Sequence, residues 1–297
     1  MKYTKLACGL ALLGAAAFTA QAQYTITTLD VPGNPYTTPH GISGNNIAGI
    51  TSDAFLNQSG FIYNGSSYTL LTCPLGDYTS IFGISGNSVV GTYTDTSYQN
   101  HAVVYNGSSW TTLNGSEARG ISGDNIVGNF SDESGQHGYL YNGSTYTTLD
   151  APLGANGTYA YGISGSSIVG YYYGTDYAQL AFLYDGTSYT TLTPPHSASA
   201  TAYGVWGDTV VGTYVDATDG YATKGFIYDG TTYTTLDIPG STSSGPLGIS
   251  ADGIVGYYNT ADGNQHGFLM AQAVPEPSTL ALAGLGGLAL LRYRRRK

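Results

Sequence analysis

The sequence GISGDNIVG at residues 120–128, followed after a short acidic link by HGYLYNGSTYTTLD at residues 137–150, is the unit from which most of this chain is built. Variants of the unit succeed one another at intervals of 42, 37, 42, 42 and 44 residues, and they begin at Gly41, Gly83, Gly120, Gly162, Gly204 and Gly248. Self-similarity at a period of about 40 residues is typical of proteins built from repeated supersecondary units. The repeat is therefore the main evidence for the fold in this sequence.

Each unit predicts two hairpins and no helix. In the first, Gly123-Asp124-Asn125 separates two short apolar stretches. In the second, Asn142-Gly143 follows an apolar strand, and such a dipeptide suits a two-residue turn because it tolerates positive φ. A tight turn here places equivalent side chains opposite one another in five units: Phe61 and Tyr68, Val103 and Trp110, Tyr139 and Tyr146, Phe182 and Tyr189, Phe226 and Tyr233.

The two ends of the repeat region predict a closed ring. The sixth unit stops at Met270 without its last strand, whereas Tyr24–Asp30 has the sequence of a last strand without a unit. Four strands cannot bury both faces of a sheet alone, so the units must pack face to face. We therefore predict an all-β fold, a six-bladed β-propeller over residues 23–273 with four-stranded blades, in which Tyr24–Asp30 completes the last blade.

The composition is that of an exported, turn-rich protein. The chain has 297 residues, 43 of them Gly and 28 Tyr, and 9% of its residues are charged. Between residues 23 and 273 the basic residues are Arg119 and Lys224, against eighteen acidic residues, which leaves a net charge near −16. Such a surface repels phosphate backbones, so nucleic acid is not expected as a partner, whereas cations and neutral glycans are tolerated.

The N-terminus has the three parts of a secretory signal peptide over residues 1–22. Lys2 and Lys5 precede an apolar run, which ends in Ala20-Gln21-Ala22. Cleavage after Ala22 leaves Cys73 as the one cysteine, so no intramolecular disulfide is expected. We predict that Cys73 is a small side chain in a loop rather than a nucleophile.

The C-terminal tail, residues 274–297, differs in character from the body. Pro275-Glu276-Pro277 precedes an apolar run over residues 280–291, which predicts a short hydrophobic helix, and the chain ends in a cluster of Arg and Lys that favours the cytoplasmic side. This arrangement resembles the PEP-CTERM sorting signal of Gram-negative bacteria. The resemblance implies recognition by an exosortase-type membrane protease, transient membrane anchoring by the tail at the inner membrane, and delivery to the cell surface or exopolysaccharide matrix.

The body of the chain is similar to the HAF-type repeats of extracellular bacterial proteins. The strand opening that carries this similarity is present as His101-Ala102-Val103, His137-Gly138-Tyr139 and His266-Gly267-Phe268, whereas other units have Ser59, Leu180 and Lys224 in place of the His. The resemblance implies export and a repeat fold, and it assigns no catalytic residues.

Alternating connections of a propeller lie on opposite faces, and here the connections between hairpins and between units are the long and varied ones. We expect ligands on that variable face, because function tends to be carried by loops on a rigid scaffold. It gathers a recurrent carboxylate after the second strand: Asp53, Asp95, Asp132, Asp176, Asp216 and Asp262. These six form either a ring that could bind Ca²⁺ or a set of loop-closing Asx-turns, and we favour the second because no dense D-x-D-x-D loop is present.

Other polar and aromatic residues have structural explanations that compete with functional ones. We expect His101, His137 and His266 to make a repeated hydrogen bond between loop and strand rather than to share a metal, since the ring separates them. The serine of the Gly-Ile-Ser-Gly motif recurs at one structural position and lacks the frame of a nucleophile elbow. The additional tyrosines suit either sugar stacking or the filling of space between blades: Tyr159, Tyr161, Tyr171, Tyr172, Tyr173, Tyr203 and Tyr221.

The sequence thus predicts an exported propeller that acts as a binding or structural protein, with polysaccharide as a candidate partner. It predicts no enzymatic activity, and no cofactor apart from the Ca²⁺ that a ring of the six aspartates could bind. The alternative is an extracellular polysaccharide-acting hydrolase or lyase that uses carboxylates of the variable face. That alternative requires two carboxyl groups about 5 to 10 Å apart in a cleft. A passive coat or spacer without a ligand is a third interpretation.

Overall fold

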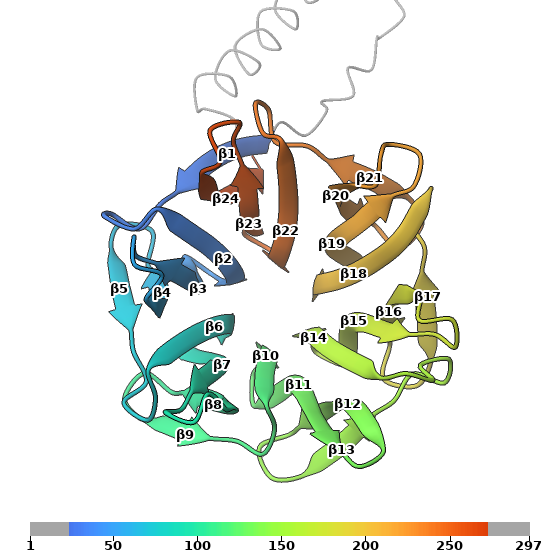
Figure 1. The fold of residues 1–297 in the computed structure, drawn as a ribbon, viewed down its shortest axis with the longest axis horizontal. Helices are drawn as coiled ribbons and strands as arrows, with labels where there is room; N and C mark the ends of the chain where they lie inside the picture. The colour runs from blue at the N-terminus through green and yellow to red at the C-terminus, as the bar shows by residue number, and fades with distance from the viewer. Residues whose placement is uncertain (1–23, 273–297) are drawn as a thin grey trace, which may run out of the picture. The chain divides into compact units, whose positions relative to one another are not determined.

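The computed structural model describes residues 24–272, which form six groups of four strands arranged radially around a central axis (Figure 1). Each group, here called a blade, has chain neighbours paired antiparallel, and the first and last blades are bridged into one eight-stranded sheet. All regular elements of the described residues are strands. The predicted all-β architecture of four-stranded blades is therefore confirmed.

The strands of the first three blades follow the chain from the axis outward. Blade 1 contains β2 (Tyr36–Ser43), β3 (Asn46–Ser52), β4 (Gln58–Tyr63) and β5 (Tyr68–Leu71). Blade 2 contains β6 (Tyr78–Ser85), β7 (Ser88–Thr94), β8 (Asn100–Tyr105) and β9 (Trp110–Thr112). Blade 3 contains β10 (Glu117–Ser122), β11 (Asn125–Asp132), β12 (Gly135–Tyr141) and β13 (Tyr146–Leu149).

The remaining blades repeat this order until the chain closes on itself. Blade 4 contains β14 (Thr158–Ser164), β15 (Ser167–Tyr173), β16 (Gln179–Tyr184) and β17 (Tyr189–Leu192). Blade 5 contains β18 (Ser197–Trp206), β19 (Thr209–Asp216), β20 (Ala222–Tyr228) and β21 (Tyr233–Leu236). Blade 6 contains β22 (Ser243–Ser250), β23 (Gly253–Asn259), β24 (Gln265–Gln272) and, from the N-terminal end, β1 (Tyr24–Leu29).

The pairing of β1 with β24 confirms that the N-terminal strand completes the last blade (Figure 1). Two further contacts join the ends of the described chain. The Thr28 hydroxyl lies 3.0 Å from the Tyr258 hydroxyl, and a parallel bridge pairs Tyr36 of β2 with Gln265 of β24. Blade 1 therefore lies directly against blade 6, and the ring is closed.

The register of the second hairpin corrects the sequence prediction by two residues. Tyr141 pairs with Tyr146, and Tyr139 pairs with Thr148, so the loop has four residues rather than two. The Asn142 side chain closes the longer loop, since its Oδ1 atom accepts hydrogen bonds from the amides of residues 144 and 145. Tyr139 still contacts Tyr146 diagonally, with ring centroids 5.4 Å apart.

The same correction holds wherever this hairpin recurs. The opposed pairs are Tyr63 and Tyr68, Tyr105 and Trp110, Tyr184 and Tyr189, and Tyr228 and Tyr233. In each case an Asn or Asp at the first loop position accepts the amides of the third and fourth residues, as Asn64 does from Ser66 and Ser67. Asx closure, rather than a two-residue turn, therefore sets the register.

The hydrophobic cores lie between adjacent blades. One core joins Val90, Ala102 and Leu113 of blade 2 to Ala118 and Tyr139 of blade 3. The third strand of every blade contributes one side chain larger than Ala that is at most 1% exposed, and these are Phe61, Val103, Tyr139, Phe182, Phe226 and Phe268. Burial of such a side chain stabilises a fold by roughly 1.5–3 kcal/mol, which no blade could obtain alone.

The glycine that opens each unit lets the innermost strands approach one another. A Cβ atom on Gly162 would lie 2.5 Å from the Tyr203 carbonyl oxygen of the next blade, and one on Gly248 would lie 2.4 Å from that of His40. The serine two residues later links neighbouring blades, because the Ser43 hydroxyl accepts a hydrogen bond of 3.1 Å from the Gly86 amide. This serine is therefore structural, as the sequence predicts.

Three predictions lie outside the described residues: the signal peptide over residues 1–22, the C-terminal tail over residues 274–297, and the hydrophobic helix over residues 280–291 within that tail. Within residues 24–272 no helix has the length and apolar character needed to cross a bilayer.

Candidate functional site

The six aspartates of the variable face close their own loops. The Asp53 carboxylate accepts hydrogen bonds from the amides of Phe55 at 2.8 Å and Asn57 at 2.9 Å. The hydrogen bond from the Asn57 side chain, followed by that from its amide, lowers the pKa of Asp53. Corresponding amide bonds within their own loops are accepted by Asp95, Asp132, Asp176, Asp216 and Asp262.

These bonds are the Asx-turns that the sequence favours over a cation ring. Oxygen atoms that accept loop amides have fewer lone pairs available for a metal. Among residues 24–272 no group of three or more His, Cys, Asp or Glu side chains could hold a metal ion. Binding of Ca²⁺ to this face stays an untested prediction.

Each of the three histidines makes a hydrogen bond to an aspartate of its own blade. His101 Nε2 lies 2.8 Å from Asp95, His137 Nδ1 lies 2.8 Å from Asp150, and His266 Nδ1 lies 2.9 Å from Asp30. In blade 5, Lys224 takes the same place and contacts Asp216 at 3.0 Å and Asp219 at 2.8 Å. The structure does not bring the histidines together, and each makes a hydrogen bond from its strand to an aspartate in a loop or connection, as predicted.

The tips of the loops between the second and third strands carry exposed apolar side chains in an unusual backbone conformation. Three residues before the histidine position, four blades have a non-glycine residue with φ between 59° and 65°: Leu56, Tyr98, Tyr177 and Tyr221. Their side chains are 67–81% exposed. We call these four residues the loop-tip set. The left-handed conformation costs an L-residue roughly 1–2 kcal/mol relative to glycine.

A comparison between blades shows that the loop itself does not require these side chains. Blade 6 has Gly263 at the same place with φ of 84°, and its loop is closed by the same pair of backbone hydrogen bonds as the loops of Leu56, Tyr98 and Tyr177. The loop of Tyr221 is two residues longer, and Gly220 beside it is also left-handed. Three blades therefore keep a large, solvent-exposed side chain in a loop where blade 6 has the less strained glycine, and blade 5 keeps one in a longer loop. Backbone strain that persists at exposed positions is an indicator of function rather than of folding.

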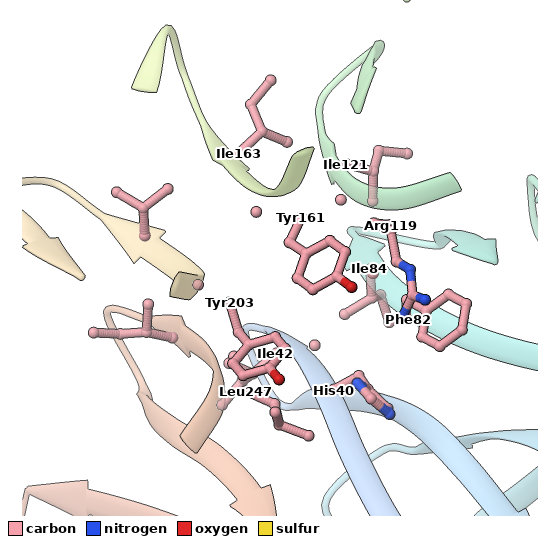
Figure 2. Close-up of a pocket in the computed structure, with 18 residues that line it drawn as sticks. His40, Ile42, Phe82, Ile84, Arg119, Ile121, Tyr161, Ile163, Tyr203 and Leu247 are labelled. Carbon is pink, nitrogen blue, oxygen red and sulfur yellow. The ribbon is translucent and has the colours of Figure 1, made fainter. Parts of the chain in front are cut away.

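A second candidate site is the cavity on the propeller axis, with a volume of about 110 Å³ (Figure 2). The innermost strand of each blade contributes three consecutive residues, and the last two are uniform, a glycine followed by Ile or Val. The first is the extra residue of a β-bulge, since the register of every innermost strand shifts there. These bulge residues differ from blade to blade: His40, Phe82, Arg119, Tyr161, Tyr203 and Leu247.

Arg119 lies between two aromatic rings in this cavity. Its guanidinium carbon is 4.0 Å from the centroid of Phe82 and 4.8 Å from that of Tyr161. Nε donates a 2.7 Å hydrogen bond to Glu117, whose carboxylate also accepts one of 3.2 Å from Asn129. Figure 2 shows Arg119, Tyr161, Tyr203 and His40 extending into the same space.

The predicted tyrosines divide between the two roles considered for them. Tyr172 is 2% exposed and fills space between blades, whereas Tyr221 is 68% exposed at a loop tip. Tyr161 stacks on Tyr203 with centroids 5.5 Å apart, and Tyr159 stacks on Tyr171 at 4.5 Å. Tyr161 also contacts Tyr171 at 5.5 Å, so a series of aromatic rings extends from the axial cavity along blade 4.

Sequence reasoning missed the axial residues. Arg119 and Glu117 entered only the charge balance, although the residue before the repeated glycine varies where its neighbours do not. Cys73 is fully buried, and burial raises the pKa of its thiol, which fits a structural side chain rather than a nucleophile.

Comparisons with known proteins bear on the two parts of the chain separately. Residues 273–297 match the PEP-CTERM protein-sorting motif, which supports recognition of this chain by an exosortase. No curated protein matches the sequence. The HAF-type resemblance stays a prediction.

Solved structures resemble the body. A putative TolB from Agrobacterium tumefaciens is 14% identical over 86% of this chain and 100% of its own, with a TM-score of 0.55. The β-propeller domain of the Trilobed protease from Pyrococcus furiosus is 11% identical over 84% and 98%, with a TM-score of 0.53. A lectin from Aleuria aurantia is 14% identical over 82% and 97%, with a TM-score of 0.50. At these identities the likeness shows the fold alone: the chain carries a sorting motif behind a β-propeller body.

Proposed function

We propose that this chain is an exported, matrix-associated propeller that binds neutral polysaccharide through the loop-tip set. The observation that carries the proposal is that Leu56, Tyr98, Tyr177 and Tyr221 are left-handed and 67–81% exposed, although blade 6 has glycine in the loop that matches the first three. Tyrosine offers a rigid apolar ring and a polar hydroxyl, a combination suited to stacking on a sugar while remaining wet.

The charge of the body supports a neutral ligand on this face. Eighteen acidic residues oppose two basic ones between residues 23 and 273, so a polyanion approaching the loops meets a repulsive field. The sorting motif at residues 273–297 supports delivery to the cell surface or extracellular matrix, where such polymers occur. The Aleuria aurantia lectin, solved in complex with a fucose-containing disaccharide, has a similar fold, but identity of 14% transfers no binding residue.

An enzyme acting on polysaccharide remains the alternative. It needs a cleft with two carboxyl groups about 5 to 10 Å apart. The axial cavity and the groove lined by Gln99, Phe130 and Tyr146 lack Asp and Glu in their linings. The pocket lined by His196, Asp216 and Lys224 has one carboxyl group. None of the three has the pair of carboxyl groups that the alternative requires, which favours binding over catalysis.

A retention assay with the producing strain's exopolysaccharide and with defined neutral polymers tests the proposal. The triple variant Tyr98→Ser, Tyr177→Ser, Tyr221→Ser should lose most of the retention shown by the wild type. Trp206→Ser is the matched control: Trp206 is 48% exposed at the hairpin turn on the other face, and five blades already have Ser at that position. Equal retention by the triple variant and the wild type would refute the loop-tip assignment, as would loss of retention in the control.

A further inference from the structure

The axial cavity combines features of a binding site that the repeat does not require. Its glycine and Ile or Val positions repeat in all six blades, whereas its bulge positions place one cation, one imidazole, three aromatic rings and one Leu around a common space. Bulges re-aim side chains and are frequent beside functional sites. A ring that only needed filling would repeat one apolar residue, as the neighbouring Ile and Val positions do.

The surroundings of Arg119 leave one edge of its guanidinium available. The guanidinium carbon lies over the rings of Phe82 and Tyr161, and Nε donates a hydrogen bond to Glu117. Among residues 24–272 no acceptor bonds to the two terminal amino groups, and the side chain keeps 21% of its surface exposed. A guanidinium held by stacking and by one carboxylate has lost its rotational freedom before any ligand arrives.

Two parallel N–H groups in a fixed plane match the two oxygens of a carboxylate. We propose that Arg119 binds the carboxylate of a small, singly charged organic acid, such as a sugar acid, in the axial cavity. The proposal does not rest on the loop-tip set, which lies on separate loops and takes a neutral ligand.

Glu117 limits the charge that the site accepts. It offsets the positive charge of Arg119, and the exterior of the body is acidic, so a polyanion is repelled both outside and inside the cavity. A ligand with one negative charge is repelled less than a polyanion, and its carboxylate can make the bidentate contact with Arg119. Removal of the Glu117 charge should therefore strengthen binding of an acid and leave binding of a neutral sugar unchanged.

His40 provides a reporter inside the site. Its enclosure in the cavity, followed by the positive charge of Arg119, lowers the pKa of the His40 imidazole to about 3, so the ring is neutral near pH 7. A carboxylate bound to Arg119 would cancel part of that charge and alter the chemical environment of the ring. The effect is visible in the histidine signals of an NMR spectrum.

The experiment is a titration of the full chain, labelled at histidine, with glucuronate and with glucose at constant ionic strength. Glucuronate should shift the His40 signal to saturation, and glucose should not. Arg119→Lys should weaken the affinity at least about tenfold because it loses the fork, whereas Glu117→Gln should strengthen it. Lys224→Met, which removes the other basic residue of the body, should leave the affinity unchanged.

Three results would overturn the proposal: equal saturation by glucose, an unaltered affinity in Arg119→Lys, or an unaltered or weaker affinity in Glu117→Gln. Glu117→Gln keeps Arg119 in place, so the test does not depend on the folding of an Arg119 variant. Failure here leaves retention of neutral polysaccharide by the loop-tip set as a separate measurement.

Discussion

The Nδ1 atom of His266 lies 2.9 Å from a carboxylate oxygen of Asp30, although 236 positions separate the two residues in the chain. This contact crosses the seam where β1 joins β24, and Leu29 beside it is 3% exposed in a core with Val31, Phe61 and Val255. The seam is therefore packed like the other contacts between blades.

Leu29→Ala should lower the free energy of unfolding by about 2–5 kcal/mol, because it removes buried methyl groups and leaves a cavity at the seam. Leu70→Ala is the control, since Leu70 is 53% exposed in β5, and it should change the value by less than about 0.5 kcal/mol. Urea unfolding followed by tyrosine fluorescence measures both. Equal effects would mean that the seam does not contribute to stability.

Gly162→Ala should cost more stability than Gly165→Ala. A Cβ atom at residue 162 meets backbone 2.5 Å away, which forces two blades apart, whereas residue 165 has open space and only its φ of 60° to oppose a side chain. We expect a loss of about 1–2 kcal/mol for Gly165→Ala and a larger one for Gly162→Ala. The reverse order in thermal unfolding would contradict the close approach of the innermost strands.

Stability should depend on pH through His137. Its hydrogen bond to Asp150, followed by the charges of Asp150 and Asp132, raises the pKa of the imidazole above its ordinary value. The stabilisation is therefore fully present below about pH 6.5 and is lost as the pH rises through the higher folded value. His137→Gln should destabilise the protein more at about pH 5.5 than at about pH 8.5.

Asp150→Asn provides the direct check on that dependence. In an NMR titration it should lower the pKa of His137 towards the ordinary value, because the principal partner of the imidazole loses its charge. A pKa of His137 that does not change in the variant would exclude Asp150 as the cause.

Tyr177→Gly should raise the free energy of unfolding by up to about 1 kcal/mol, because glycine relieves the left-handed conformation at residue 177. The same variant should reduce retention on neutral polysaccharide. Tyr24→Gly, in the extended strand β1, should instead destabilise the protein. A destabilised Tyr177→Gly would show that the side chain serves the fold and would remove the main support for the loop-tip set.

Replacement of Pro275, Glu276 and Pro277 by alanine should abolish surface delivery, since residues 273–297 match a protein-sorting motif. Fractionation of cells followed by mass spectrometry of the mature C-terminus measures both delivery and cleavage. Normal delivery of the variant would refute the role of this motif in sorting this chain.

The sequence predicts those parts of the structure that the repeat specifies six times. The blades, the closing strand and the Asx-turn at Asp53 follow from spacing and local chemistry, because each depends on residues that are close in the chain or on the count of units. The predicted register of the second hairpin is wrong because the Asn142 side chain stabilises a four-residue loop. The Asn-Gly dipeptide alone does not distinguish such a loop from a two-residue turn.

The axial site could not be predicted in the same way. Phe82, Arg119 and Tyr161 come from three blades, and their stacking depends on bulges that set each side chain towards the axis. Nothing local to Arg119 in the sequence shows which rings will cover it. The varying residue before a repeated glycine was the available signal, and it gains meaning only once the six strands are placed around one axis.

The pairing of β1 with β24 also determines how much of the chain must be synthesised before the ring can close. Strand β1 is among the first parts of the body to leave the ribosome, and its partner β24 is the last. Until Gln265–Gln272 has been made, Tyr24–Leu29 has an unpaired edge and the first blade has no neighbour on one side. The ring therefore closes only when β24 is present, and a product truncated before Gln265 would keep unpaired strand edges at β1 and β23 instead of forming a smaller closed ring.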